Sequence, residues 1–141
     1  MREIASHYCE KDSKGGQVAR FLSIYVEEAH AIDEWWLWDA PEAHVGGKRC
    51  ILNHISIEDR VKVANKMQKD IDFPGEIICD AMIGEVNDRY GAWPERLYII
   101  DAKGNVVYKG GEGPFGYKLA EVQDWLAERY GRRGEPIKHR Q

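Results

Sequence analysis

Hydrophobic and polar positions change their spacing several times along the chain, and each change predicts a new element of secondary structure. Apolar residues at helical spacing predict a helix over residues 2–10, and a strongly apolar run predicts a buried strand over residues 18–27. Ser56, followed by Glu58 and Asp59, predicts the start of a second helix. A serine side chain can cap a helix, and acidic residues favour its first turn.

The second half of the chain continues this pattern. A short strand is predicted over residues 76–80 and a helical turn over residues 85–90. Residues 96–100 and 105–108 are predicted to form a hairpin, because Asp, Gly and Asn residues separate two apolar runs. An amphipathic helix is predicted over residues 119–130. The predicted order is helix, strand, helix, strand, short helix, hairpin and helix, which indicates an α/β domain.

Composition limits the classes of function. With 141 residues, of which 43% are hydrophobic, we expect one domain over residues 1–130 and a flexible basic tail over residues 131–141. The net charge of -4 argues against a nucleic acid partner. No apolar run approaches the length of about 18 residues that a membrane span needs. The three widely spaced cysteines form no disulfide framework, so we expect a cytoplasmic protein.

Titratable side chains follow directly on the first predicted strand. Glu27, Glu28 and His30 stand where the apolar run ends, and in parallel α/β sheets chemistry gathers at the carboxyl ends of strands. Strand alternation would place Glu28 and His30 on one face, and Glu27 and Tyr25 on the other. Taken alone, His30 is better explained as a structural histidine that caps the end of the strand; together with its acidic neighbours it would stand at the rim of an active site.

Several separate stretches of sequence, in this order, match a known pattern. They are Tyr25-Val26-Glu27-Glu28-Ala29-His30, Asn53-His54, Ile57-Glu58-Asp59-Arg60, Tyr90 to Ile100, and Val107 to Pro114 with Tyr117. Together they resemble the iodothyronine deiodinase family over most of residues 18–130. The loop between the two histidines looks longer than is usual in that family.

The resemblance implies a fold. We expect a thioredoxin-like, three-layer α/β/α sandwich that lacks its first β-strand and the start of its first helix. Such folds place a cis-proline beside the active site, and Pro94 is the candidate. An ordinary tight turn with a trans bond is the alternative, because most bonds before proline are trans.

The resemblance also implies roles for individual residues. His30 is expected to donate a proton or to hold the substrate phenol, since histidine titrates near neutrality. Glu28 is expected to orient it or to join the proton relay. For substrate binding the candidates are His54, Tyr25 and Arg96, each with a structural alternative: a loop histidine, a core tyrosine and a salt bridge.

The nucleophile of the family, a selenocysteine or a cysteine, has no counterpart in the sequence. Cys9 falls at the wrong end of its predicted helix to be activated by the helix dipole. Cys79 is predicted to be a core residue of its strand. Cys50 is the one plausible substitute, and a buried or idle thiol is the alternative reading. We expect Met1 to be an internal methionine of a longer protein, and the chain by itself to be inactive.

The functional prediction is therefore a thiol-dependent oxidoreductase that removes iodide from iodinated phenols, with thyroxine deiodination as the type reaction. Two alternatives remain: a thioredoxin-like thiol peroxidase or reductase, and a non-catalytic binding module. We expect a small aromatic, halogenated substrate, a thiol as reductant, no cofactor, and a homodimer. A metal site from His44, Cys50 and His54 is not expected, because their spacing matches no standard zinc pattern.

Overall fold

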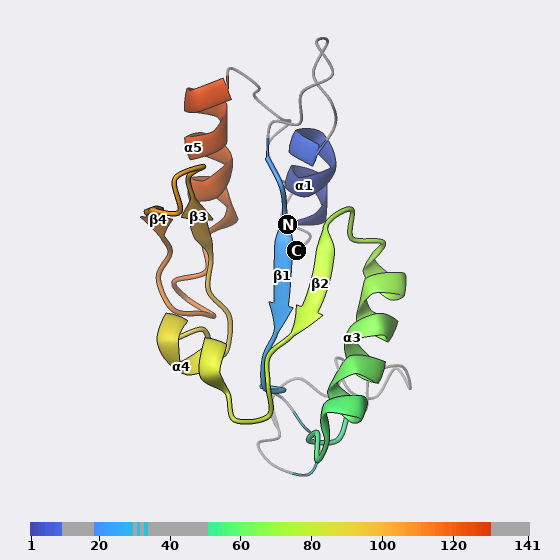
Figure 1. Ribbon diagram of the computed structural model, residues 1–141. Coiled ribbons are helices and arrows are strands. Elements are labelled where there is room, and N and C mark those ends of the chain that lie inside the picture. The colour runs from blue at the N-terminus through green and yellow to red at the C-terminus, as the bar shows by residue number, and fades with distance from the viewer. Residues whose placement is uncertain (10–18, 30, 32, 34–50, 131–141) are drawn as a thin grey trace.

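Two parallel strands, separated in sequence by a long helix, form the centre of the fold (Figure 1). The computed structural model describes residues 1–9, 19–29, 31, 33 and 51–130. Strand β1 (Leu22–Tyr25) pairs with β2 (Glu76–Cys79). The register sets Leu22 opposite Glu76 and Tyr25 opposite Cys79, so the two strands end together.

Helix α3 (Ile57–Ile71) lies alongside β2 and begins where the sequence predicts. The Ser56 hydroxyl accepts a hydrogen bond from the Asp59 backbone N–H at 3.2 Å, which caps the first turn. The helix ends at Asp72, which adopts the left-handed conformation with φ of 46°. A positive φ at a residue other than glycine interrupts the helical hydrogen bonding and sends the chain back to β2.

A short helix and a hairpin follow β2 along the chain. Strands β3 (Tyr98–Ile100) and β4 (Val106–Lys109) are antiparallel. The Asp101 carboxylate accepts hydrogen bonds at 2.9 Å from two backbone N–H groups of the turn, and Gly104 supplies a φ of 86°. Helix α4 (Glu85–Tyr90) precedes the hairpin and ends at Gly91.

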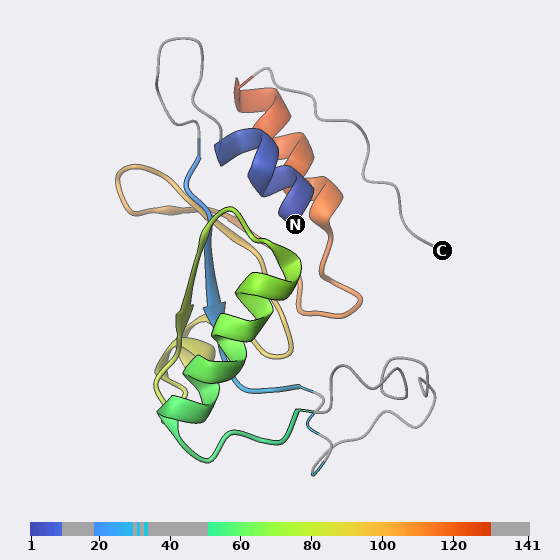
Figure 2. The same ribbon diagram turned by 90° about the vertical axis from the view of Figure 1, so that its right-hand side faces the viewer.

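The hydrophobic core lies between the first and last helices. Helix α1 (Arg2–Cys9) contributes Ile4 and Tyr8, and α5 (Leu119–Tyr130) contributes Val122 and Leu126. These two helices lie side by side in Figure 2. Burying a side chain of this size contributes about 1.5–3 kcal/mol, so this contact ties the two ends of the described fold together.

The order of elements predicted from the sequence is confirmed, and the chain is a mixed α/β protein. The predicted bounds differ most at the first strand. Strand β1 covers four residues rather than the ten predicted over residues 18–27, because the chain turns away after Tyr25. The predicted tail at residues 131–141 lies outside the described residues.

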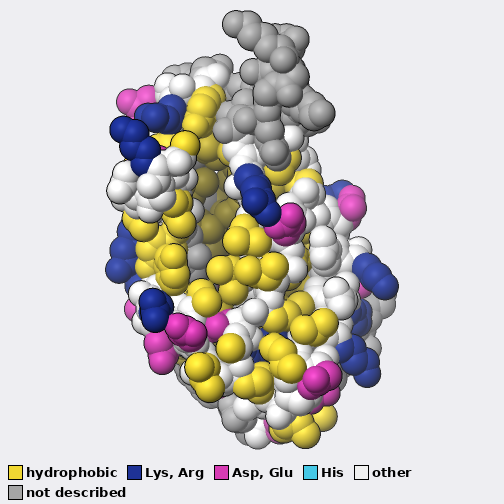
Figure 3. All heavy atoms as spheres, in the orientation of Figure 1, with side chains coloured by type: hydrophobic (Ala, Val, Ile, Leu, Met, Phe, Trp, Pro, Cys, Tyr) yellow, Lys and Arg dark blue, Asp and Glu magenta, His cyan; other side chains and the backbone are white. Residues whose placement is uncertain are grey.

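Both strand pairs have an open edge. Within the described residues, β1 pairs only with β2, and β3 pairs only with β4. Phe21, just before β1, and Leu97 and Ile99 at β3 pack against the same hydrophobic cluster. Leu22 and Ile78 stay 49% and 46% exposed. Hydrophobic side chains also gather at the centre of the face shown in Figure 3.

Among the described residues, no helix is both long enough and apolar enough to cross a lipid bilayer.

Candidate functional site

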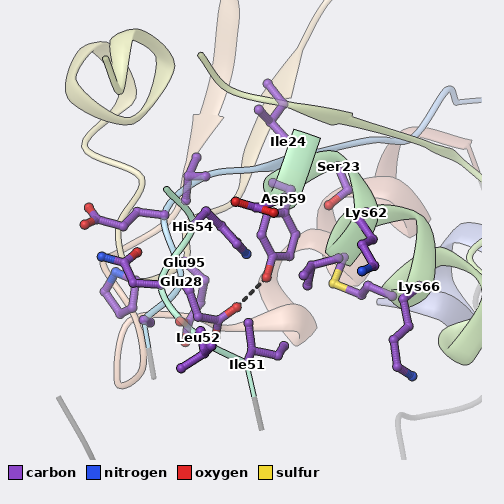
Figure 4. A pocket seen from close by; sticks show the side chains of 18 of the residues that line it. Ser23, Ile24, Glu28, Ile51, Leu52, His54, Asp59, Lys62, Lys66 and Glu95 are labelled. Atoms are coloured by element: carbon purple, nitrogen blue, oxygen red, sulfur yellow. Dashed lines mark hydrogen bonds between the residues drawn. The ribbon is translucent and has the colours of Figure 1, made fainter. Parts of the chain in front are cut away.

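A cleft of about 1320 Å³ opens at the carboxyl end of β1 (Figure 4). Its wall is mainly apolar, with Ile24 from β1, Leu52 from the segment before α3, and Met67 from α3. Polar and charged side chains line it as well: Glu28 and His54 lie on one side, and Lys62 and Lys66 of α3 lie on the other. A mainly apolar cleft with a few converging polar groups is the usual form of a site for a small organic molecule.

The first polar contact in the cleft joins Tyr25 to Glu28. The Tyr25 hydroxyl donates a short hydrogen bond to the Glu28 carboxylate, drawn as the dashed line in Figure 4. Burial, together with this hydrogen bond, raises the pKa of Tyr25 well above its usual range. The phenol therefore stays protonated at neutral pH and acts as a donor to the carboxylate.

This contact corrects the prediction that Tyr25 and Glu28 face opposite sides. Alternation holds only while the chain is extended, and β1 ends at Tyr25. Glu28 lies in the irregular segment that follows, so a residue three positions further along can fold back onto the tyrosine.

His54 is the second polar group, and it is only 6% exposed. Its ring lies 5.5 Å from the Tyr25 ring, centroid to centroid, at a tilt of 49°. Neither ring nitrogen has a hydrogen-bond partner within the described residues. Burial, and then the charge of Arg60, lower the pKa of His54, so the imidazole is neutral at physiological pH.

A neutral imidazole has one donor and one acceptor nitrogen, and leaving both unpaired in a buried site is costly. Such a side chain in a cleft is suited to bind a hydroxyl group of a ligand. The neighbouring backbone N–H of Asn53 is held by the Asp33 carboxylate at 2.8 Å. This bond fixes the segment that carries His54 close to the chain after β1.

Comparison with known proteins gives the cleft a family context. The family model described as iodothyronine deiodinase matches residues 12–130. Thyroxine 5-deiodinase of Rattus norvegicus is 42% identical over 111 residues, which is 78% of this chain and 33% of that protein. The protein of the same name from Homo sapiens gives the same values. The chain belongs to the iodothyronine deiodinase family.

Family membership covers only part of the relatives' length. Thyroxine 5-deiodinase of Sparus aurata is 39% identical over 117 residues, which is 82% of this chain and 40% of that protein. The chain thus spans between a third and two fifths of the curated relatives that it matches. Their names assign them the 5-deiodination of thyroxine.

In this deiodinase family member the peptide bond between Trp93 and Pro94 is cis. Pro94 and the following Glu95 line the cleft together with Glu28 and His54. The proline thus lies at the cleft, where the resemblance to thioredoxin-like proteins places it.

Arg96 has a different environment. Arg96 is not among the described residues that line the cleft. Its guanidinium donates to the Glu112 carboxylate and to the Tyr90 carbonyl, both at 3.3 Å. These contacts match the salt-bridge alternative and link the end of α4 to the turn after β4.

Two predicted site residues, His30 and Cys50, lie outside the described residues, as does His44. Cys79 was predicted to be a core residue, but it is the last residue of β2 and is partly exposed. Burial raises the pKa of the Cys79 thiol, which disfavours the reactive thiolate. The described residues hold no cluster of His, Cys, Asp and Glu side chains suited to a metal ion.

Sequence reasoning assigned no role to Arg60, which is only 4% exposed. Its Nη1 donates to the carbonyl oxygens of Asp80 and Ala81, both at 2.9 Å, just beyond β2. A signal was present in the sequence, since a cation four residues after the cap of α3 opposes the helix dipole.

Proposed function

We propose that this protein reductively removes iodide, or a related halide, from halogenated phenols by means of a selenolate or thiolate. The observation that supports this most is the cluster of Tyr25, Glu28 and His54 in an apolar cleft of a deiodinase family member. The apolar wall suits an aromatic ring, and the two free nitrogens of His54 suit a phenolic hydroxyl.

In this proposal His54 forms a hydrogen bond to the phenol of the substrate, and the Glu28 carboxylate takes part in proton transfer. Glu28 accepts a hydrogen bond from Tyr25, which fixes the orientation of the carboxylate. Glu28 or His30 is the candidate donor of the proton that the ring carbon takes up, while Tyr25 keeps its own proton and orients Glu28. General acid catalysis of this kind contributes typically about 10²–10⁴-fold to a rate.

The reaction balances as follows. The chalcogenolate attacks iodine, the carbon–iodine electron pair goes to the ring carbon, and that carbon takes up a proton. The product is a deiodinated phenol, and iodine stays on the sulfur or selenium. A first thiol displaces iodide from it and releases a proton, and a second thiol reduces the mixed disulfide or selenenyl sulfide. Overall, two thiols are oxidised to a disulfide and one carbon–iodine bond is reduced.

We further propose that a strand carrying the nucleophile pairs with the open edge of β1. The free edge of β1 within the described residues supports this, because the backbone groups of a buried strand need hydrogen-bond partners. Such a strand would end at the same edge as Tyr25 and would bring its last residue to the cleft. It would also complete the thioredoxin-like sandwich.

The test compares the chain as printed with the gene product extended upstream in frame. Iodide release from 3,5-diiodophenol would be measured with dithiothreitol as reductant, and peroxide consumption would be measured in parallel. We expect the extended protein to release iodide, and H54N and E28Q in that protein to lose at least about tenfold in rate. K69Q, an exposed substitution on α3 outside the cleft, serves as control.

The alternatives give different results. Iodide release by the printed chain that disappears in C50S would assign the thiol to Cys50. Peroxide consumption without iodide release would favour a thiol peroxidase. Neither activity in either protein would contradict the proposed function and favour a binding module.

A further inference from the structure

Helix α3 lines one wall of the cleft with a regular stripe of charged and apolar side chains. The stripe recurs every three or four residues, which is the spacing of one helix face. Its charged members are Asp59, Lys62, Lys66 and Asp70, and its apolar members are Val63, Met67 and Ile71. A ligand in the cleft would therefore lie against a wall that offers both apolar contact and charge.

Three of the four charges in this stripe already have a partner. The Asp59 carboxylate accepts a hydrogen bond from the Ser56 hydroxyl at 2.9 Å. Lys66 forms an ion pair with Asp70, one turn further along α3, at 2.6 Å. Lys62 forms no ion pair with any other described residue. Within the described part of the cleft, its amine is thus the cation that is available to a ligand.

Lys62 lies across the cleft from the imidazole of His54. In Figure 4, Glu28 and His54 lie on one side, and Lys62 and Lys66 lie on the other. The rest of the wall is mainly apolar and suits an aromatic ring. A molecule whose hydroxyl group binds His54 would therefore present its opposite end to Lys62.

We propose that Lys62 binds an acidic group of the substrate, so that the cleft selects halogenated phenols with a carboxylate at the end opposite the hydroxyl. A carboxylate there gains a charge-assisted contact with the amine, while the ring stays against the apolar wall. This inference rests on the proposed function for its phenolic substrate. Lys62 is then a specificity-determining residue, because it contacts the end of the substrate that lies away from the phenol.

Acidic side chains also line the cleft, and the inference has to account for them. Glu28 and Asp33 each accept a hydrogen bond, from a tyrosine hydroxyl and from a backbone N–H. Glu27 and Glu95 line the cleft as well. If these carboxylates set the preference, the cleft would favour a cationic group on the ligand. The test therefore includes an amine.

The test measures the binding of three probes that share one iodinated phenol and differ at the opposite end. They are 3-(4-hydroxy-3,5-diiodophenyl)propanoate, its methyl ester and 3,5-diiodotyramine. Because the phenol is the same in all three, its ionisation affects them alike. Dissociation constants would be measured by calorimetry with the printed chain at low ionic strength, where charge contacts are least screened. We expect the acid to bind about threefold or more tightly than the ester, and the amine to bind no better than the ester.

Substitutions of Lys62 assign this preference to its charge. K62Q should remove the difference between acid and ester, and K62R should keep it. K62E should reverse the order, so that the amine binds more tightly than the acid. K69Q, which removes the same charge from an exposed position of α3 outside the cleft, should leave the preference for the acid unchanged. Lys62 is exposed, so we expect these variants to fold like the original protein.

Equal binding of acid and ester, or a preference for the acid that survives K62Q, would overturn the inference. So would tightest binding of the amine, or the failure of all three probes to bind. Because binding needs no turnover, a preference that depends on Lys62 without any iodide release would contradict the proposed function alone. Iodide release with the same KM for acid and ester would contradict this inference alone. Where release is measurable, K62Q should raise KM for the acid about threefold or more and leave kcat unchanged.

Discussion

The Tyr25 hydroxyl donates a hydrogen bond to the carboxylate of Glu28, a residue only three positions further along the chain. This bond forms because β1 stops at Tyr25 and the chain then turns. It gathers a phenol and a carboxylate at the mouth of the cleft, where each restrains the other. The end of the strand, rather than the strand itself, therefore builds this part of the site.

Removing the Tyr25 hydroxyl should destabilise the protein and loosen Glu28. A hydrogen bond to a charged group contributes about 1.5–3 kcal/mol, and partial exposure reduces this, so Y25F should cost about 1–2 kcal/mol in urea unfolding. Tyr108 offers a matched control, because its hydroxyl donates to the Glu121 carboxylate at 2.8 Å on an exposed surface. Y108F should cost less than about 1 kcal/mol. Equal losses in the two variants would argue against a special role for the bond in the cleft.

The stability of the protein should fall as pH drops through the range in which histidine titrates. The pKa of His54 is lowered in the folded state, so the unfolded chain binds a proton at higher pH than the folded one does. Stability is then fully present above the unfolded pKa of about 6.5, and declines as pH falls toward the folded value. Urea midpoints at pH 7.5, 6.5 and 5.5 measure this.

The H54Q variant isolates that contribution. Glutamine keeps a donor and an acceptor but does not titrate in this range. As pH falls, the original protein should therefore lose more unfolding free energy than H54Q does. A constant difference across the three pH values would show that His54 keeps an ordinary pKa in the fold.

Local patterns predicted much of this fold, since its elements carry their own start and stop signals. Ser56 caps α3, and the turn around Asp101 and Gly104 closes the hairpin, as expected from neighbouring residues alone. Contacts between distant segments were beyond such reasoning. The Arg60 guanidinium donates hydrogen bonds to carbonyls twenty and twenty-one residues further along the chain. No rule of sequence spacing predicts a partner at that separation.

The candidate site was predicted in part for the same reason. Glu28, His54 and Tyr25 were singled out by motif, and the structure brings them to one cleft. Alternation failed for Tyr25 and Glu28 because it assumes an extended chain beyond the true end of β1. Arg96 belongs to a motif as well, but a motif does not say which way a side chain points, and this one pairs with Glu112.

Asp80 should be important for stability although it takes no part in the proposed chemistry. Its buried carboxylate accepts two backbone N–H groups of the first turn of α4, and D80A would leave those donors without a partner. We expect a loss of about 2–3 kcal/mol in urea unfolding. Asp101 makes the same pair of contacts in an exposed turn, where water can replace the carboxylate, so D101A should cost far less. A similar cost for both variants would contradict the importance of burial.

The spacing of β1 and β2 should depend on Gly75. A Cβ atom at this position would lie 2.4 Å from the Phe21 carbonyl oxygen and 2.7 Å from Cε1 of the Phe73 ring. Because that carbonyl also accepts the Glu76 backbone N–H at 3.1 Å, it cannot retreat without loosening the strand pair. G75A should therefore cost about 2–3 kcal/mol and shift the NMR signals of Tyr25 and His54. G104A is the control: it also lowers stability, because Gly104 has a φ of 86°, yet it has open space around it and should leave those signals in place. Unchanged Tyr25 and His54 signals in a folded G75A protein would show that the cleft does not depend on the spacing of β1 and β2.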